Sequence, residues 1–96
     1  MINLAQFFKE ELQLFKLEYA ELFDSETVQL VPYPFHQVDR FNMALAELAQ
    51  MRDYVKEALK VPRFSCQALE DVASEYNQAL DTLELNYEDF QASMPL

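Results

Sequence analysis

The sequence predicts an all-α fold, most simply a three-helix bundle, and three observations support this prediction. Apolar residues recur at the three- and four-residue spacing of a helix over about residues 4–23, 35–60 and 66–90. Residues typical of helix starts and stops lie at the ends of these stretches. At 51% apolar residues the chain is too hydrophobic to be disordered, despite a net charge of −10. Residues 1–96 are therefore expected to form a single helical domain.

The first helix is expected at about residues 4–23. Asn3 is a good N-cap, Gln6 stands where a capping-box partner belongs, and Ile2 and Phe7 stand where a hydrophobic staple forms. One arc of the helix is apolar and is predicted to face the core. Its members are Leu4, Phe8, Leu12, Phe15, Tyr19, Leu22 and Phe23.

The second helix is expected at about residues 35–60, with Pro34 suited to its first position and Pro62 ending it. Lys56 and Lys60 lie in its last turn, where cations interact favourably with the helix dipole. The predicted buried arc consists of Phe41, Leu45, Leu48, Val55 and Leu59, flanked by Ala44 and Met51.

The third helix is expected at about residues 66–90, capped by Ser65 and stapled by Phe64 and Leu69. Its predicted buried arc consists of Leu69, Val72, Tyr76, Ala79, Leu80, Leu83, Tyr87 and Phe90. The short connection before it predicts that the second and third helices are antiparallel neighbours. The first connection, DSETVQLVPYPFHQ, is long enough to return along the bundle or to place the first helix on another copy.

The composition excludes several chemistries. Glycine is absent, which removes the phosphate-binding loop, the dinucleotide fingerprint and the strained serine elbow. The single histidine lies in no Glu-x-x-His pair, so we predict no metal site. Because these motifs are missing, we also predict no cofactor and no catalytic residues. The chain has no apolar run of about 18 residues and no basic segment typical of a signal peptide, and one cysteine suits a reducing compartment. We expect a cytoplasmic protein that binds no membrane.

An enzyme using Cys66 as nucleophile and His36 as base is the least favoured alternative. Cys66 would be the first residue of the third helix, where a thiol can be activated. We interpret it instead as a small apolar residue at the edge of the core, near Ala73. If the second helix starts at Pro34, His36 lies on its outer side, in line with Met43. Nothing in the sequence brings the two together.

The acidity is uneven, because residues 61–96 contain Arg63 against seven carboxylates. Such a surface repels nucleic acid and anionic membranes. The acidic face of the third helix can be a solvated surface, a docking surface for a basic partner, or a DNA mimic that blocks a nucleic-acid-binding protein. Leu85 lies in the middle of this face, where a protein contact could use it as an anchor. The acidic face consists of Glu70, Asp71, Glu75, Asp81, Glu84, Glu88 and Asp89.

Several apolar residues lie outside the predicted core arcs. On the first helix they are Phe7, Leu14 and Leu17, of which Phe7 is assigned to the staple, and on the second they are Met43 and Tyr54. Either the long connection covers them or another chain does, as a homodimer or a hetero-complex, and we favour another chain. Arg52 lies within an apolar arc and is expected to reach a carboxylate across the bundle or an interface.

The predicted function is protein binding without catalysis, as an adaptor, inhibitor or chaperone-like subunit; the DNA-mimic decoy is the main alternative. The predicted partner-binding residues are Leu14, Leu17, Met43, Glu47, Tyr54, Glu75, Asp81, Glu84 and Leu85.

Overall fold

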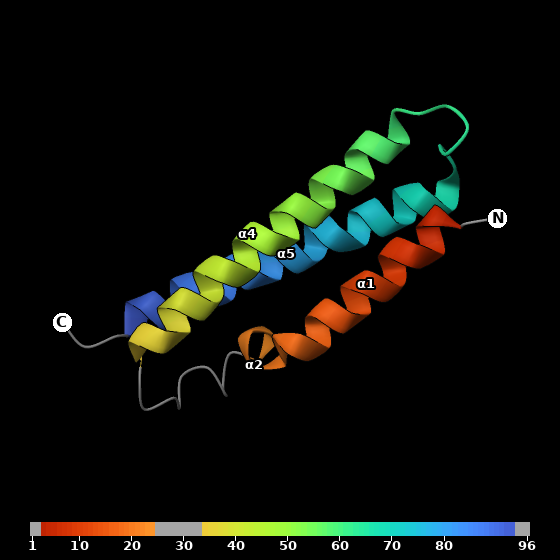
Figure 1. The fold of residues 1–96 in the computed structure, drawn as a ribbon. Coiled ribbons are helices and arrows are strands. Elements are labelled where there is room, and N and C mark those ends of the chain that lie inside the picture. The colour runs from red at the N-terminus through yellow and green to blue at the C-terminus, as the bar shows by residue number, and fades with distance from the viewer. Residues whose placement is uncertain (1–2, 25–33, 94–96) are drawn as a thin grey trace.

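The computed structural model describes residues 3–24 and 34–93, and within them the fold is all-α, as predicted. Its helices are α1 (Leu4–Glu18), α2 (Ala20–Phe23), α4 (Pro34–Leu59) and α5 (Gln67–Ser93). In Figure 1, α1, α4 and α5 lie as long rods, and the short α2 follows the end of α1. The path of the long first connection lies outside the described residues for positions 25–33.

Among the described helices, α5 packs against the other three, whereas backbone contacts between α1 and α4 are sparse. A short turn joins α4 to α5, so the two are antiparallel, as predicted (Figure 1). The start of α1 lies beside the start of α5, where Ala5 and Ala68 line one pocket. At the other end, Asn86 Nδ2 of α5 donates to the carbonyl of Leu22 in α2 at 2.8 Å. Helix α1 is therefore parallel to α5 and antiparallel to α4.

The buried side chains form one cluster along the three rods, and the predicted arcs supply most of it. On α4 the fully buried residues are Phe41, Ala44, Leu48 and Val55. Tyr87, predicted to be buried, is half-buried and stacks on Phe41 with ring centroids 4.8 Å apart. The cluster on α1, α2 and α5 consists of Ala5, Leu12, Phe15, Tyr19, Leu22, Leu69, Val72, Ala73, Tyr76, Ala79, Leu80, Leu83 and Phe90.

The N-cap of α1 is confirmed, but the capping box is only half formed. Asn3 Oδ1 accepts a hydrogen bond from the backbone N–H of Gln6 at 3.2 Å. The Gln6 side chain does not return to Asn3; its Nε2 donates instead to Glu10 Oε1 at 3.1 Å, one turn further along. The partner of Phe7 in the predicted staple, Ile2, lies outside the described residues.

The predicted helix over 4–23 breaks at Tyr19, whose φ of −111° and ψ of 32° are not helical. The N–H of Leu22 bonds to the carbonyl of Tyr19 at 2.9 Å, which leaves the carbonyl of Glu18 without its usual helical partner. Arg40 Nη2 of α4 donates to that carbonyl at 3.0 Å. The carbonyl left open by the break is therefore hydrogen-bonded by a side chain from another helix, which the local sequence could not indicate.

Tyr76 is fully buried at the centre of α5, and its hydroxyl donates to the carbonyl of Phe8 at 2.7 Å. Burial, with a smaller contribution from the negative charge of Glu11, raises the pKa of Tyr76 to about 12. The neutral phenol is thus held inside the fold by a bond between α5 and α1.

Replacing Tyr76→Phe is expected to lower the free energy of unfolding by about 1 kcal/mol at neutral pH, because one interhelical hydrogen bond is lost. The folded pKa lies above the ordinary value of 10.0. The phenol therefore contributes its full stability below pH 10, and this contribution is lost as pH rises toward 12. Urea unfolding at pH 8 and at pH 11 measures how far the free energy of unfolding falls between these two pH values. This fall should be larger in the wild type than in Tyr76→Phe. An equal fall in the two proteins would contradict the raised pKa of Tyr76.

Candidate functional site

The contacts between α4 and the α1–α2 segment show which side of α4 faces α1. Arg40 Nη2 and Nε both donate to Glu21 Oε1, at 2.6 and 3.0 Å, and the guanidinium lies 4.4 Å from the centroid of the Tyr19 ring. The Tyr19 hydroxyl donates to Glu47 Oε2 at 3.2 Å. Met43 lies on the same side of α4, because helix spacing places it between Arg40 and Glu47.

Burial and hydrogen bonding to the Glu47 carboxylate raise the pKa of Tyr19. The tyrosine therefore remains a neutral donor in this contact.

Arg40→Gln is expected to lower the free energy of unfolding by about 1 kcal/mol, since it removes a partly exposed ion pair, a bond to a backbone carbonyl and a cation–π contact. Arg52→Gln is the matched control. Arg52 was expected to reach a carboxylate across the bundle or across an interface; within the bundle it pairs instead with its neighbour Asp53 at 3.2 Å. Its loss should change stability by less than about 0.5 kcal/mol. Thermal unfolding of both variants measures the difference, and equal effects would contradict this account.

The opposite flanks of α1 border different helices. Lys9 and Glu75 line two pockets between α1 and α5, of about 220 and 190 Å³, and Gln13 and Lys16 line the smaller one. Helix spacing places Phe7, Glu11, Leu14 and Glu18 on the other flank, which borders α4. We name these four residues, with Arg40, Met43, Glu47, Gln50 and Tyr54 of α4, the α1–α4 face.

The α1–α4 face exposes large apolar side chains. Leu14 and Met43 are each 60% exposed, Tyr54 is 56% exposed and Phe7 is 48% exposed. Gln50 Nε2 donates to the Tyr54 hydroxyl at 3.0 Å, which fixes the polar end of that ring and leaves the rest of it on the surface. The exposure of Leu14, Met43 and Tyr54 is as the helical spacing predicted.

The nine predicted partner-binding residues do not share one surface. Four of them, Leu14, Met43, Glu47 and Tyr54, belong to the α1–α4 face. Leu17, 75% exposed, lies on the side of α1 opposite the core. Asp81, Glu84 and Leu85 lie with Glu88 around a shallow hollow of about 310 Å³ on the outer side of α5, which we name the α5 outer face.

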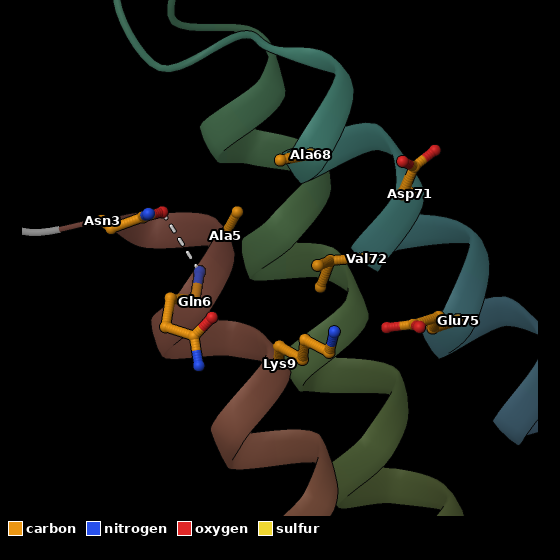
Figure 2. A pocket seen from close by; sticks show the side chains of 8 residues that line it. All are labelled: Asn3, Ala5, Gln6, Lys9, Ala68, Asp71, Val72 and Glu75. Carbon is orange, nitrogen blue, oxygen red and sulfur yellow. Dashed lines mark hydrogen bonds between the residues drawn. The ribbon is translucent and has the colours of Figure 1, made fainter.

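Glu75, the ninth residue, does not lie on the α5 outer face; with Asp71 it borders α1. It lines both pockets between α1 and α5, and Figure 2 shows its carboxylate and the Lys9 ammonium extending toward one another across the larger pocket. Glu75 thus faces a cation of its own chain. It contributes less to an acidic surface than its place on the helix indicates.

The α1–α4 face includes residues that sequence reasoning missed. Phe7 was assigned to the staple, yet nearly half of it is exposed. Glu11 and Glu18 alternate with Phe7 and Leu14 at helical spacing, and this spacing indicates that the four residues share one side of the helix. The contact of Arg40 with Glu21 had no such signal, because the two residues lie on either side of the long first connection.

Cys66 and His36 do not form a pair in the fold. Cys66 is exposed just before α5 and is not at the edge of the core, because α5 begins one residue later than predicted and its first buried residue is Leu69. His36 is exposed in the first turn of α4, which does begin at Pro34. Most of α4 separates the two, roughly 35 Å at 1.5 Å per residue. A nucleophile and base must be within hydrogen-bonding reach.

Within residues 3–24 and 34–93, no three His, Cys, Asp or Glu side chains are grouped to hold a metal ion. None of the described helices is both long and apolar enough to cross a bilayer. Comparison of the chain with protein-family models, curated proteins and solved structures gives no match. Its function must therefore be inferred from the chemistry of its surfaces.

Proposed function

We propose that this chain is a non-catalytic protein-binding module that docks on its partner through the α1–α4 face, as an adaptor, inhibitor or chaperone-like subunit. One observation is the basis of the proposal: four large apolar side chains from two helices are exposed on the same side of the bundle. Burying such a side chain fully is worth about 1.5–3 kcal/mol. Contiguous exposed apolar residues with a polar surround are typical of protein interfaces.

Affinity capture from the source cell, followed by sizing of the complex, tests this proposal. The wild-type chain is expected to recover a protein, which can be a second copy or a different chain. Sizing then separates a homodimer from a hetero-complex. If the chain runs as a monomer and captures nothing, the proposal is wrong.

The acidic decoy is a second candidate, because α5 displays an extended anionic surface. Its seven carboxylates are all exposed, and Gln67–Ser93 contains neither Lys nor Arg. A decoy would bind a basic, nucleic-acid-binding protein electrostatically, so its binding should weaken steeply with salt.

Charge reversal at Asp81, Glu84 and Glu88 to Lys separates the two candidates. A decoy is expected to lose its partner, whereas a protein docking through the α1–α4 face is expected to keep it with little change in salt dependence. Binding measured from 50 to 300 mM salt provides the comparison. Retained binding by the charge-reversed variant contradicts the decoy.

We propose a cytoplasmic location on the basis of Cys66, whose exposed thiol would form intermolecular disulfides in an oxidising compartment. Disulfide-linked dimers on a non-reducing gel of the protein trapped in its source cell would contradict this proposal.

A further inference from the structure

The residues of the α1–α4 face have the spacing of residues on a helix that packs against another helix. On α1 they are residues 7, 11, 14 and 18, and on α4 residues 40, 43, 47, 50 and 54. Steps of three and four alternate in both sets, which gives the 3.5-residue period of packed helices. Backbone contacts between α1 and α4 are sparse, so the two sets border a side of the bundle that the described helices do not close.

The ion pair between Arg40 and Glu21 sets the register of the two antiparallel helices. Counting seven residues back from Glu21 and seven residues forward from Arg40 places Leu14 level with Glu47. Counting seven more residues on each chain segment places Phe7 level with Tyr54. Apolar side chains therefore lie on both helices along the face, and glutamates lie between them.

The length of the face limits the size of its occupant. Glu18 lies level with Met43, and Phe7 lies level with Tyr54. These two levels are eleven residues of α1 apart. At 1.5 Å per residue this is roughly 17 Å, or three helical turns. A helix of three to four turns therefore covers the whole face.

The charge of the face selects the chemistry of the occupant. Among the described residues, no cation lies within ion-pair distance of Glu11, Glu18 or Glu47. Arg40, the cation of this face, is already paired with Glu21. A helix that covers the apolar residues brings its own flanks beside these three carboxylates, where Lys or Arg is favoured. A second copy of this chain is disfavoured, because it carries a net charge of −10 and its own exposed apolar residues also lie beside glutamates.

We infer that the partner element bound by the α1–α4 face is a basic amphipathic helix of another protein, with an apolar stripe between flanks of Lys or Arg. This inference rests on the proposed function and names the chemistry of its partner. The helix lies along α1 and α4 and buries Phe7, Leu14, Met43 and Tyr54.

Site-specific photo-crosslinking of the full chain in its source cell tests the inference. The photoreactive amino acid p-benzoylphenylalanine takes the place of Leu14 in one protein and of Leu85, on the α5 outer face, in the matched control. Position 14 is expected to crosslink to one helical segment with a net positive charge, and position 85 is not. Mass spectrometry identifies the segment.

The outcomes separate the inference from the proposed function. A crosslink from position 14 to an acidic or neutral segment, or to a second copy of this chain, overturns the basic-helix inference and leaves protein binding intact. No crosslink from position 14 to any protein overturns both. A basic segment captured equally from position 85 also overturns the assignment of this partner to the α1–α4 face.

A charge test follows with the captured segment prepared as a synthetic peptide. Glu11→Gln with Glu18→Gln is expected to weaken peptide binding about tenfold and to flatten its salt dependence. Glu84→Gln with Glu88→Gln removes the same charge from α5 and is expected to change affinity less than twofold. Circular dichroism confirms that both proteins are folded. Equal weakening by the two pairs overturns the inference, because it shows attraction to net charge alone.

Discussion

Replacing Leu14→Asp and Met43→Asp together is expected to weaken partner binding by about 100-fold or more while the protein stays folded. Interface anchors that become fully buried commonly contribute about 2 kcal/mol each, and 1.4 kcal/mol is a factor of ten in affinity. Each aspartate also puts an unpaired charge into the contact. Because both side chains are 60% exposed in the chain alone, their loss removes little from its own core.

The matched control is Leu17→Asp with Leu85→Asp, which makes the same chemical change at two exposed leucines outside the α1–α4 face. Isothermal titration with the captured partner measures affinity, and thermal unfolding verifies that both double variants remain folded. The control is expected to bind within about threefold of the wild type. If the control loses binding and the Leu14 and Met43 variant keeps it, the docking site lies elsewhere on the surface.

Phe41→Ala is expected to lower the free energy of unfolding by about 3–5 kcal/mol. The ring is fully buried, stacked on Tyr87 at 4.8 Å and 12° between planes, and 5.8 Å from the ring of Phe90. Alanine would leave a cavity where α4 and α5 pack. Chemical unfolding monitored by circular dichroism measures the loss.

Met43→Ala is the control for this prediction, since it removes an apolar side chain two residues further along the same helix. Its expected effect on stability is below about 0.5 kcal/mol, because the side chain is on the surface. Comparable losses at positions 41 and 43 would mean that Met43 is part of the core, and the α1–α4 face would then lose one of its anchors.

The sequence predicted the helices well because each is stabilised mainly by one apolar arc. Leu48, Val55, Leu69 and Leu83 are buried at the positions that a 3.6-residue period assigns them. Apart from the break at Tyr19, helix ends differed by up to three residues, since α5 continues to Ser93. Local spacing could not predict the break at Tyr19, which is satisfied by Arg40 from another helix.

The candidate site was predicted only in part. Spacing along each helix identified Leu14, Met43 and Tyr54 as exposed, because exposure depends on the angle of a residue from its own apolar arc. It also grouped Leu85 with them, although Leu85 lies on the α5 outer face. Which residues of different helices share a surface depends on how the helices are rotated and aligned against one another.

The sequence by itself determined that this protein is helical and, at most positions, which side chains its helices bury and which they leave exposed, because these depend on the period of one helix and the order of its residues. The tertiary structure decided that α1 runs antiparallel to α4, that Arg40 and Tyr19 join them at one end, and that Phe7, Leu14, Met43 and Tyr54 lie on one face. These relations depend on contacts between residues on either side of the long first connection, and no local pattern in the chain specifies them.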